Sequence, residues 1–128
     1  MKIQDIALRR IIDSRGNPTV EAEIKTKNGF GRAAAPAGAS TGTHEAVAWP
    51  DGSVSKGMKI AEEKIMPQLV GLQTEDQENF DKTLKEIDGT DNFSKVGGNI
   101  SVALSLACAK AAADSKGITL YEHIGKTD

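Results

Sequence analysis

The segment 100–113 constrains the fold most strongly, because its apolar residues cover nearly the whole circumference of a helix. One face carries Ile100, Ala103, Leu104, Ala107, Cys108 and Ala111, and the other carries Val102, Leu106, Ala109 and Ala113. A helix that is apolar on almost every side is normally buried. Its many alanines also let neighbouring elements approach closely. We therefore predict that this helix lies in the core of the domain.

The first third of the chain is predicted to form β-structure. Residues 20–25 alternate apolar and polar side chains, which is the pattern of a strand with one buried face. Residues 30–35 are the expected return strand, and residues 3–12 are a further, less regular strand. Asn28-Gly29 is a strong hairpin signal, because both residues tolerate positive φ angles. Together these segments predict a three-stranded antiparallel meander.

The remaining two-thirds is predicted to be helical. Residues 56–65 place apolar side chains on one side, and Pro67 is expected to bend or end that helix. Residues 74–77 have the form of a capping box, in which the side chains of Thr74 and Gln77 bond to free backbone N–H groups.

A second helix is expected after this capping box, with Phe80, Leu84 and Ile87 at helical spacing and a stop at residues 88–89. Residues 120–124 are predicted to form a last short helix. The predicted fold class is therefore α+β: a three-stranded antiparallel meander followed by a bundle of about four helices, in one domain of 128 residues.

The charge balance and the single cysteine narrow the class of protein. Sixteen basic and eighteen acidic residues leave a net charge of -2, so no nucleic-acid partner is expected. The chain lacks an apolar run of the roughly 20 residues that cross a bilayer, so no membrane partner is expected. One cysteine, Cys108, permits no internal disulfide. We expect a cytoplasmic protein.

Few residues are candidates for chemistry. His44 and His123 are far apart and lack metal-ligand spacing, and Cys108 lies in the most apolar helix, which favours a core role. The small, flexible residues of 36–43 suit either a surface connection or a loop that approaches a ligand. Residues 13–19 suit a tight turn between two strands.

Five motifs in the same order resemble those of enolases. They are residues 13–21 (DSRGNPTVE), 38–42 (GASTG) with 44–46 (HEA), 86–90 (EIDGT), 94–99 (SKVGGN), and the alanine-rich 105–113 with Leu120-Tyr121. This resemblance implies reversible loss of water from 2-phosphoglycerate to give phosphoenolpyruvate. Such sites use a basic residue and Mg2+ ions that stabilise the ene-diolate.

The resemblance also implies which domain carries the catalytic and metal-binding residues. The base, the acid and the main metal carboxylates of enolases lie on a C-terminal (β/α)8 barrel, which needs roughly 250 residues. We expect this barrel to lie outside the chain, so that residues 1–128 form an N-terminal lid or capping domain. No residue of the chain is therefore assigned a catalytic role, and Mg2+ is expected to be bound mainly by the barrel.

The residues that resemble functional positions fall into two groups. The expected lid loop over the substrate consists of Gly38, Ala39, Ser40, Thr41 and Gly42. Within it, Ser40 is expected to supply oxygen ligands to a second Mg2+, which prefers oxygen. The residues expected near the interface of a homodimer, or of a larger homo-oligomer, are Arg9, Arg15 and Glu21.

Two departures from the family pattern keep other interpretations open. Ala37 stands where enolases usually carry serine, and residues 47–51 (VAWPD) lack the usual acidic residue and arginine. The leading hypothesis is a piece of a Mg2+-dependent enolase. These departures are the only support for an alternative, a stand-alone enolase-like binding module without catalysis. A capping domain of a related enzyme that acts on a different acid is a third interpretation.

Overall fold

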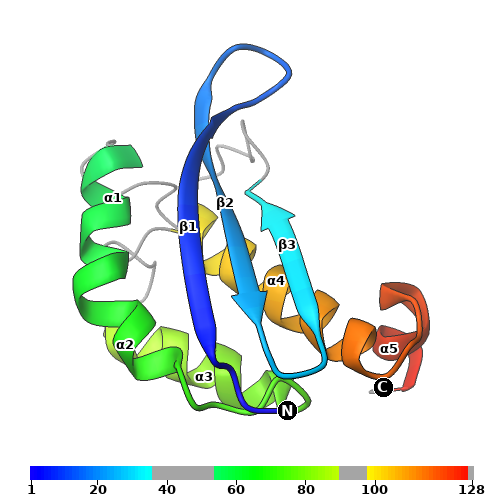
Figure 1. Ribbon diagram of the computed structural model, residues 1–128. Helices are drawn as coiled ribbons and strands as arrows, with labels where there is room; N and C mark the ends of the chain where they lie inside the picture. The colour runs from blue at the N-terminus through cyan, green and yellow to red at the C-terminus, as the bar shows by residue number, and fades with distance from the viewer. Residues whose placement is uncertain (36–53, 90–97, 127–128) are drawn as a thin grey trace.

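The computed structural model describes residues 1–35, 54–89 and 98–126. The sheet consists of β1 (Asp5–Ile12), β2 (Pro18–Lys25) and β3 (Phe30–Ala34). The strands are antiparallel and neighbours in space follow their order in the chain, so the predicted meander is confirmed (Figure 1).

One face of the sheet is covered by α4 (Gly98–Ser115), which packs against β2 and β3 (Figure 1). The alternating residues Val20, Ala22 and Ile24 point toward this helix and are completely buried. The alternation predicted this face correctly because successive strand side chains point to opposite sides of the sheet.

The helix predicted at 100–113 is present, and most of its apolar surface is buried as expected. Ile100, Leu104 and Cys108 have no exposed surface. The prediction of burial on nearly every side is wrong at two positions, since Val102 and Leu106 are 43% and 37% exposed. These two residues lie one turn apart on the side of α4 that the described elements leave uncovered.

Glycine lets α4 approach β3 at backbone distance. A Cβ atom on Gly31 would lie 2.0 Å from the Ala107 carbonyl oxygen, and one on Gly29 would lie 2.5 Å from that of Ala111. The hairpin predicted at Asn28-Gly29 is present, with a bond of 2.8 Å from the Thr26 N–H to the Gly29 carbonyl. The reason given for it is wrong: the φ angle of Gly29 is not positive, and glycine is needed there because of the helix.

The first helical run continues past Pro67 instead of ending there. It comprises α1 (Val54–Ile60), a π-helical segment (Ala61–Ile65) and α2 (Met66–Leu69). The Met66 N–H donates to the Ala61 carbonyl, five residues earlier. Proline has no N–H and cannot donate the regular α-helical hydrogen bond. The π-helical segment just before it accommodates this missing bond.

The capping box predicted at residues 74–77 is wrong. The next helix, α3 (Gln77–Asp88), begins after Asp76, whose Oδ1 accepts a bond of 3.1 Å from the Asn79 N–H. Thr74 is buried and its hydroxyl donates to the Met1 carbonyl instead. The predicted stop is confirmed, since Gly89 ends the helix in the left-handed conformation at φ 68°.

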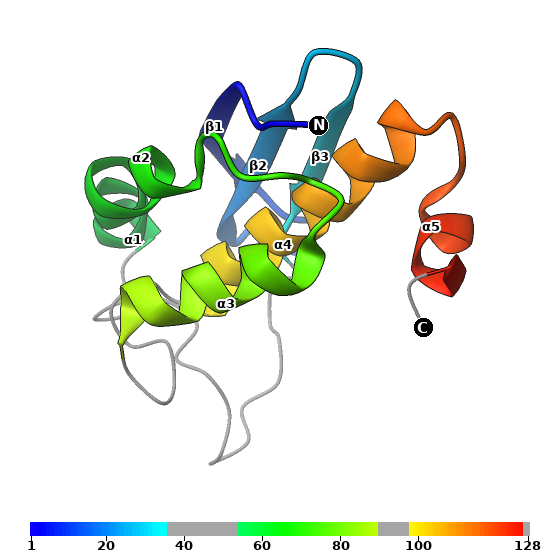
Figure 2. The same ribbon diagram turned by 90° about the horizontal axis from the view of Figure 1, so that it is seen from below.

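The last described helix is α5 (Leu120–Lys126), which confirms the prediction of a short helix there. Its start is capped by Thr119, whose hydroxyl accepts from the Glu122 N–H at 3.1 Å and donates to the Glu122 carboxylate at 3.2 Å. Counting α1 to α2 as one run, four helical runs lie within the described ranges, as predicted. Both α3 and α5 pack against α4 (Figure 2).

Candidate functional site

The expected lid loop lies outside the described residues. This applies to Gly38, Ala39, Ser40, Thr41 and Gly42, and also to Ala37 and residues 47–51. The residue that leads into this segment is well anchored: Ala35 is buried, and its N–H donates to the Val20 carbonyl at 2.9 Å. The Thr19 hydroxyl donates to the Ala35 carbonyl at 3.1 Å, so the chain leaves the sheet from a fixed point.

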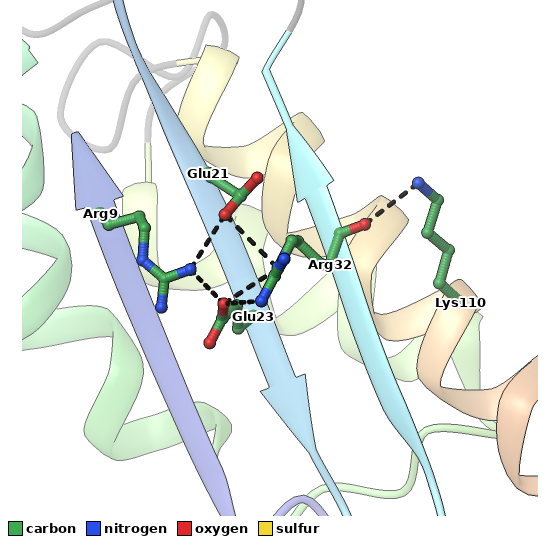
Figure 3. Close-up of polar contacts among 5 residues, drawn as sticks. All are labelled: Arg9, Glu21, Glu23, Arg32 and Lys110. Carbon is green, nitrogen blue, oxygen red and sulfur yellow. Dashed lines mark hydrogen bonds and ion pairs between the residues drawn. The ribbon is translucent and has the colours of Figure 1, made fainter. Parts of the chain in front are cut away.

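Two of the residues predicted near a subunit interface, Arg9 and Glu21, lie on the sheet face turned away from α4. Strand pairing places Arg9 opposite Glu21 and Glu23 opposite Arg32, so four alternating charges meet across three strands. We call Arg9, Glu21, Glu23 and Arg32 the ion-pair cluster (Figure 3). In Figure 1 this face of the sheet carries none of the described helices.

Each arginine of the ion-pair cluster contacts both glutamates. Arg9 Nη1 lies 3.0 Å from Glu21 Oε1 and also bonds to Glu23 Oε1. Arg32 Nη2 lies 2.8 Å from Glu23 Oε1, and Arg32 Nε lies 3.5 Å from Glu21 Oε1. The arginine side chains are about half exposed, at 48% and 53%, whereas those of the glutamates are 20% and 15% exposed. The arginines are therefore the groups that a partner could reach first.

The two arginines stabilise the ionised form of Glu23. Its hydrogen bond from Arg9 lowers its pKa, and Arg32 adds to this effect, whereas burial opposes it. The same bond raises the pKa of Arg9 above its ordinary value. Both shifts favour the charged forms, so Arg9 and Glu23 are held as an ion pair at neutral pH.

Sequence reasoning identified two of the four members of this cluster. Arg9 and Glu21 were both predicted near a subunit interface, and the structure brings them into contact with each other; Glu23 and Arg32 were missed. The alternation of residues 20–25 already places both glutamates on one face, so Glu23 could have been found. Arg32 could not, because its position opposite Glu23 depends on the register of β3.

Arg15 lies apart from this cluster, in the turn between β1 and β2. The Asp13 carboxylate holds the turn by accepting bonds of 2.8 Å from the N–H groups of Arg15 and Asn17. Gly16 adopts a positive φ of 81° in it. The turn predicted for residues 13–19 is thus present, and the Arg15 side chain projects from its exposed end.

Of the other candidate groups, His44 lies outside the described residues and Cys108 has a structural role. Cys108 is buried, its thiol faces the Thr74 carbonyl at 3.7 Å, and burial, with Asp81 and Glu75 adding to it, raises its pKa to about 12. This supports the predicted core role. Within the described ranges, no three His, Cys, Asp or Glu residues are grouped so that they could hold a metal ion. Nor is any helix of these ranges long and apolar enough to cross a membrane.

These features define a two-layer α+β domain with one helix-covered sheet face and one charged, open face. Residues 3–124 match the family model described as the enolase N-terminal domain. The chain belongs to this family.

Several proteins named enolase are similar to the chain. The enolase of Methanosphaera stadtmanae is 56% identical over 123 residues, which is 96% of the chain and 30% of the relative. That of Methanothermobacter thermautotrophicus is 52% identical over 123 residues, with the same two shares. That of Thermoplasma acidophilum is 48% identical over 125 residues, or 98% of the chain and 31% of the relative. The chain thus spans about 30% of the length of these curated relatives.

Proposed function

We propose that the chain serves as the N-terminal domain of a cytoplasmic enolase, which reversibly dehydrates 2-phosphoglycerate to phosphoenolpyruvate. The observation that carries this proposal is the family match over residues 3–124, on a fold with the strand and helix order expected for it. The high identity to proteins named enolase supports the same activity, with Mg2+ as cofactor.

The role of this domain in the reaction is to cover the site rather than to transfer the proton. When bound, Mg2+ would stabilise the negative charge that develops on the substrate carboxylate. Residues 38–42 would close over the site and exclude water, and Ser40 would face the second metal ion. The anchoring of Ala35 to Val20 and Thr19 gives this loop a fixed base on the sheet.

The open sheet face would form part of the contact between subunits of a homodimer. Arg9 and Glu21 lie on this face and carry opposite charges, and the side chain of Arg9 is 48% exposed. Charged groups of this kind set the orientation and specificity of an interface more than its affinity. Arg15, at the end of the β1–β2 turn, would extend the same contact.

A chimera tests the proposal directly. The chain replaces the matching part of the Methanosphaera stadtmanae enolase, and formation of phosphoenolpyruvate is followed by its ultraviolet absorbance. We expect turnover by the chimera, and none by the chain alone or by the remainder of the relative alone. A chimera that folds, binds substrate and has no activity would contradict the proposal.

The lid assignment has its own variant in this chimera. Ser40→Ala is expected to lower kcat by at least about tenfold, as the loss of one ligand or positioning group commonly does, while leaving the melting temperature nearly unchanged. Thr43→Ala, in the same segment but outside the GASTG motif, is the matched control. Equal losses of melting temperature and rate would show that Ser40 acts through the fold.

A further inference from the structure

The free edge of β3 is the part of the sheet that the proposed function leaves unexplained. Among the residues that the structure describes, β3 pairs only with β2, so its other edge faces away from the sheet. The Ala35 N–H donates to the Val20 carbonyl, and the Gly29 carbonyl accepts from the Thr26 N–H. In an antiparallel pair, every second residue turns its N–H and C=O groups toward the partner strand, and the residues in between turn theirs away from it. Phe30, Arg32 and Ala34 therefore direct their backbone polar groups toward the free edge.

Two side chains of α4 occupy backbone groups on this edge. The Asp114 carboxylate accepts a bond of 2.9 Å from the Phe30 N–H. The Lys110 ammonium donates a bond of 3.0 Å to the Arg32 carbonyl (Figure 3). Both groups belong to the outward-facing set, so Lys110 and Asp114 take positions that a neighbouring strand would otherwise fill.

The spacing of the two contacts follows from the geometry of the two elements. Lys110 and Asp114 are four residues apart on a helix, which corresponds to a rise of about 6 Å. Phe30 and Arg32 are two residues apart on a strand, which corresponds to about 6.6 Å. The glycines at 29 and 31 allow α4 to lie close enough to β3 for both side chains to reach the edge.

The edge would otherwise be suited to pairing with another strand. An exposed strand with open N–H and C=O groups is a template for association, and charged groups are a common means of blocking it. Phe30 is 42% exposed at this edge, which adds apolar surface, and the Arg32 guanidinium lies over its ring at 5.4 Å. The other edge strand is partly covered, because Ile3 exchanges backbone bonds with Gly71 and Leu72 just before β1 begins.

We propose that Lys110 and Asp114 form an edge clamp that keeps β3 from pairing with the β3 strand of a second copy of the chain. The clamp works by occupying backbone hydrogen-bonding groups, not by net charge, because its two members carry opposite charges. It requires no ligand and is independent of the enolase activity proposed above.

The test compares two double variants of the full 128-residue chain. Lys110→Ala/Asp114→Ala opens the edge, whereas Lys82→Ala/Glu86→Ala removes an exposed ion pair with the same spacing on α3. Both changes leave the net charge at -2. Self-association is measured by sedimentation over a range of concentrations, and hydrogen exchange is measured at the amides of residues 30–34.

The open-edge variant is expected to associate at least about tenfold more tightly than the unchanged chain, a difference accessible to sedimentation. The amides of Arg32 and Ala34 should gain protection as the concentration rises. The control variant should behave like the unchanged chain. Unchanged association, or association without added protection in β3, would overturn the proposal.

A second variant tests whether the clamp depends on its hydrogen bonds to the backbone or on its charges. Lys110→Gln/Asp114→Asn removes both charges but keeps a donor and an acceptor at the same positions. It should remain as monomeric as the unchanged chain if occupation of the backbone groups is what matters. Association equal to that of the alanine variant would overturn this mechanism. If the alanine variant does not fold, the single change Asp114→Ala, which frees only the Phe30 N–H, replaces it in the same assay with the same expected sign.

Discussion

The two faces of the sheet differ in the interactions that their side chains make: apolar packing on one face and ion pairs on the other. On the covered face, Ala22 and Ile24 are completely buried against α4, and Gly31 brings the two backbones together. On the open face, the half-exposed Arg9 forms an ion pair with Glu23, whose side chain is 15% exposed. Burial of apolar surface contributes most of the free energy of folding, whereas exposed ion pairs contribute little. The covered face should therefore set the stability of the domain, and the open face should set its contacts.

Truncation of a core residue in α4 should have the largest effect. Leu104→Ala removes a side chain with no exposed surface and leaves a cavity, so we expect the free energy of unfolding to fall by about 2–5 kcal/mol. Val102→Ala on the same helix, at 43% exposure, should cost less than about 1 kcal/mol. Denaturant unfolding measures both. Similar losses would show that the buried and the exposed sides of α4 contribute equally to the free energy of unfolding.

Added volume at the contact between α4 and β3 should have the next largest effect. Gly31→Ala places a Cβ atom 2.0 Å from the Ala107 carbonyl oxygen, so the helix must move, and we expect a loss of about 3 kcal/mol. The matched control is Gly16→Ala, which meets no atom within 4 Å but must adopt a φ of 81°, at a cost of about 1–2 kcal/mol. If Gly31→Ala were no worse than this control, the close packing of α4 would not be needed for stability.

A buried histidine on α5 and a glutamate on the open sheet face should lose their contributions to stability in different pH ranges. His123 is buried, with Nδ1 3.0 Å from the Lys116 ammonium, and burial together with this charge lowers its pKa below 6.5, although Glu75 opposes the shift. On acidification the unfolded chain therefore takes up this proton first. The contribution of neutral His123 to the free energy of unfolding is therefore complete above pH 6.5 and is lost as the pH falls below that value.

Glu23 on the open face also has a lowered pKa, but its ordinary value is 4.5. Its contribution is therefore complete above pH 4.5 and is lost only at lower pH. Unfolding measured from pH 7 to pH 3 should show two separate losses of stability. His123→Gln should remove most of the first and leave the second. A single loss, or a first loss that persists in this variant, would contradict the assignment.

The parts of the fold that were predicted correctly depend on local periodicity. Alternation in residues 20–25 and helical spacing in residues 100–113 are set by the side chains themselves, so both elements were found. The capping box failed because Thr74 is drawn into a buried contact with Met1, which is distant in the sequence. The role of Gly29 was misjudged for the same reason, since Ala111 lies against it only after the chain folds.

The candidate site shows the same division between local and distant information. Arg9 and Glu21 were assigned from the family resemblance, and their contact of 3.0 Å follows from the pairing of β1 with β2. Arg32 joins them through the register of β3, which no motif specifies. The resemblance thus identified Arg9 and Glu21 but not Arg32, whose place in the cluster depends on strand pairing.

The smallest expected effect on stability is on the open face, where it sharpens the comparison most. Glu23→Gln removes the carboxylate that bonds both arginines, yet exposed ion pairs are worth about 0–1 kcal/mol, so denaturant unfolding should change by no more than this. Glu86→Gln, in the exposed pair with Lys82, is the control and should cost equally little.

In the chimera, however, Glu23→Gln should weaken subunit association measured by sedimentation, because Arg9 and Arg32 lose the group that orients them. Loss of stability beyond that of a core truncation would place the ion-pair cluster among the determinants of folding. Unchanged association would remove Glu23 from the proposed interface, since orientation of the arginines would then not matter there.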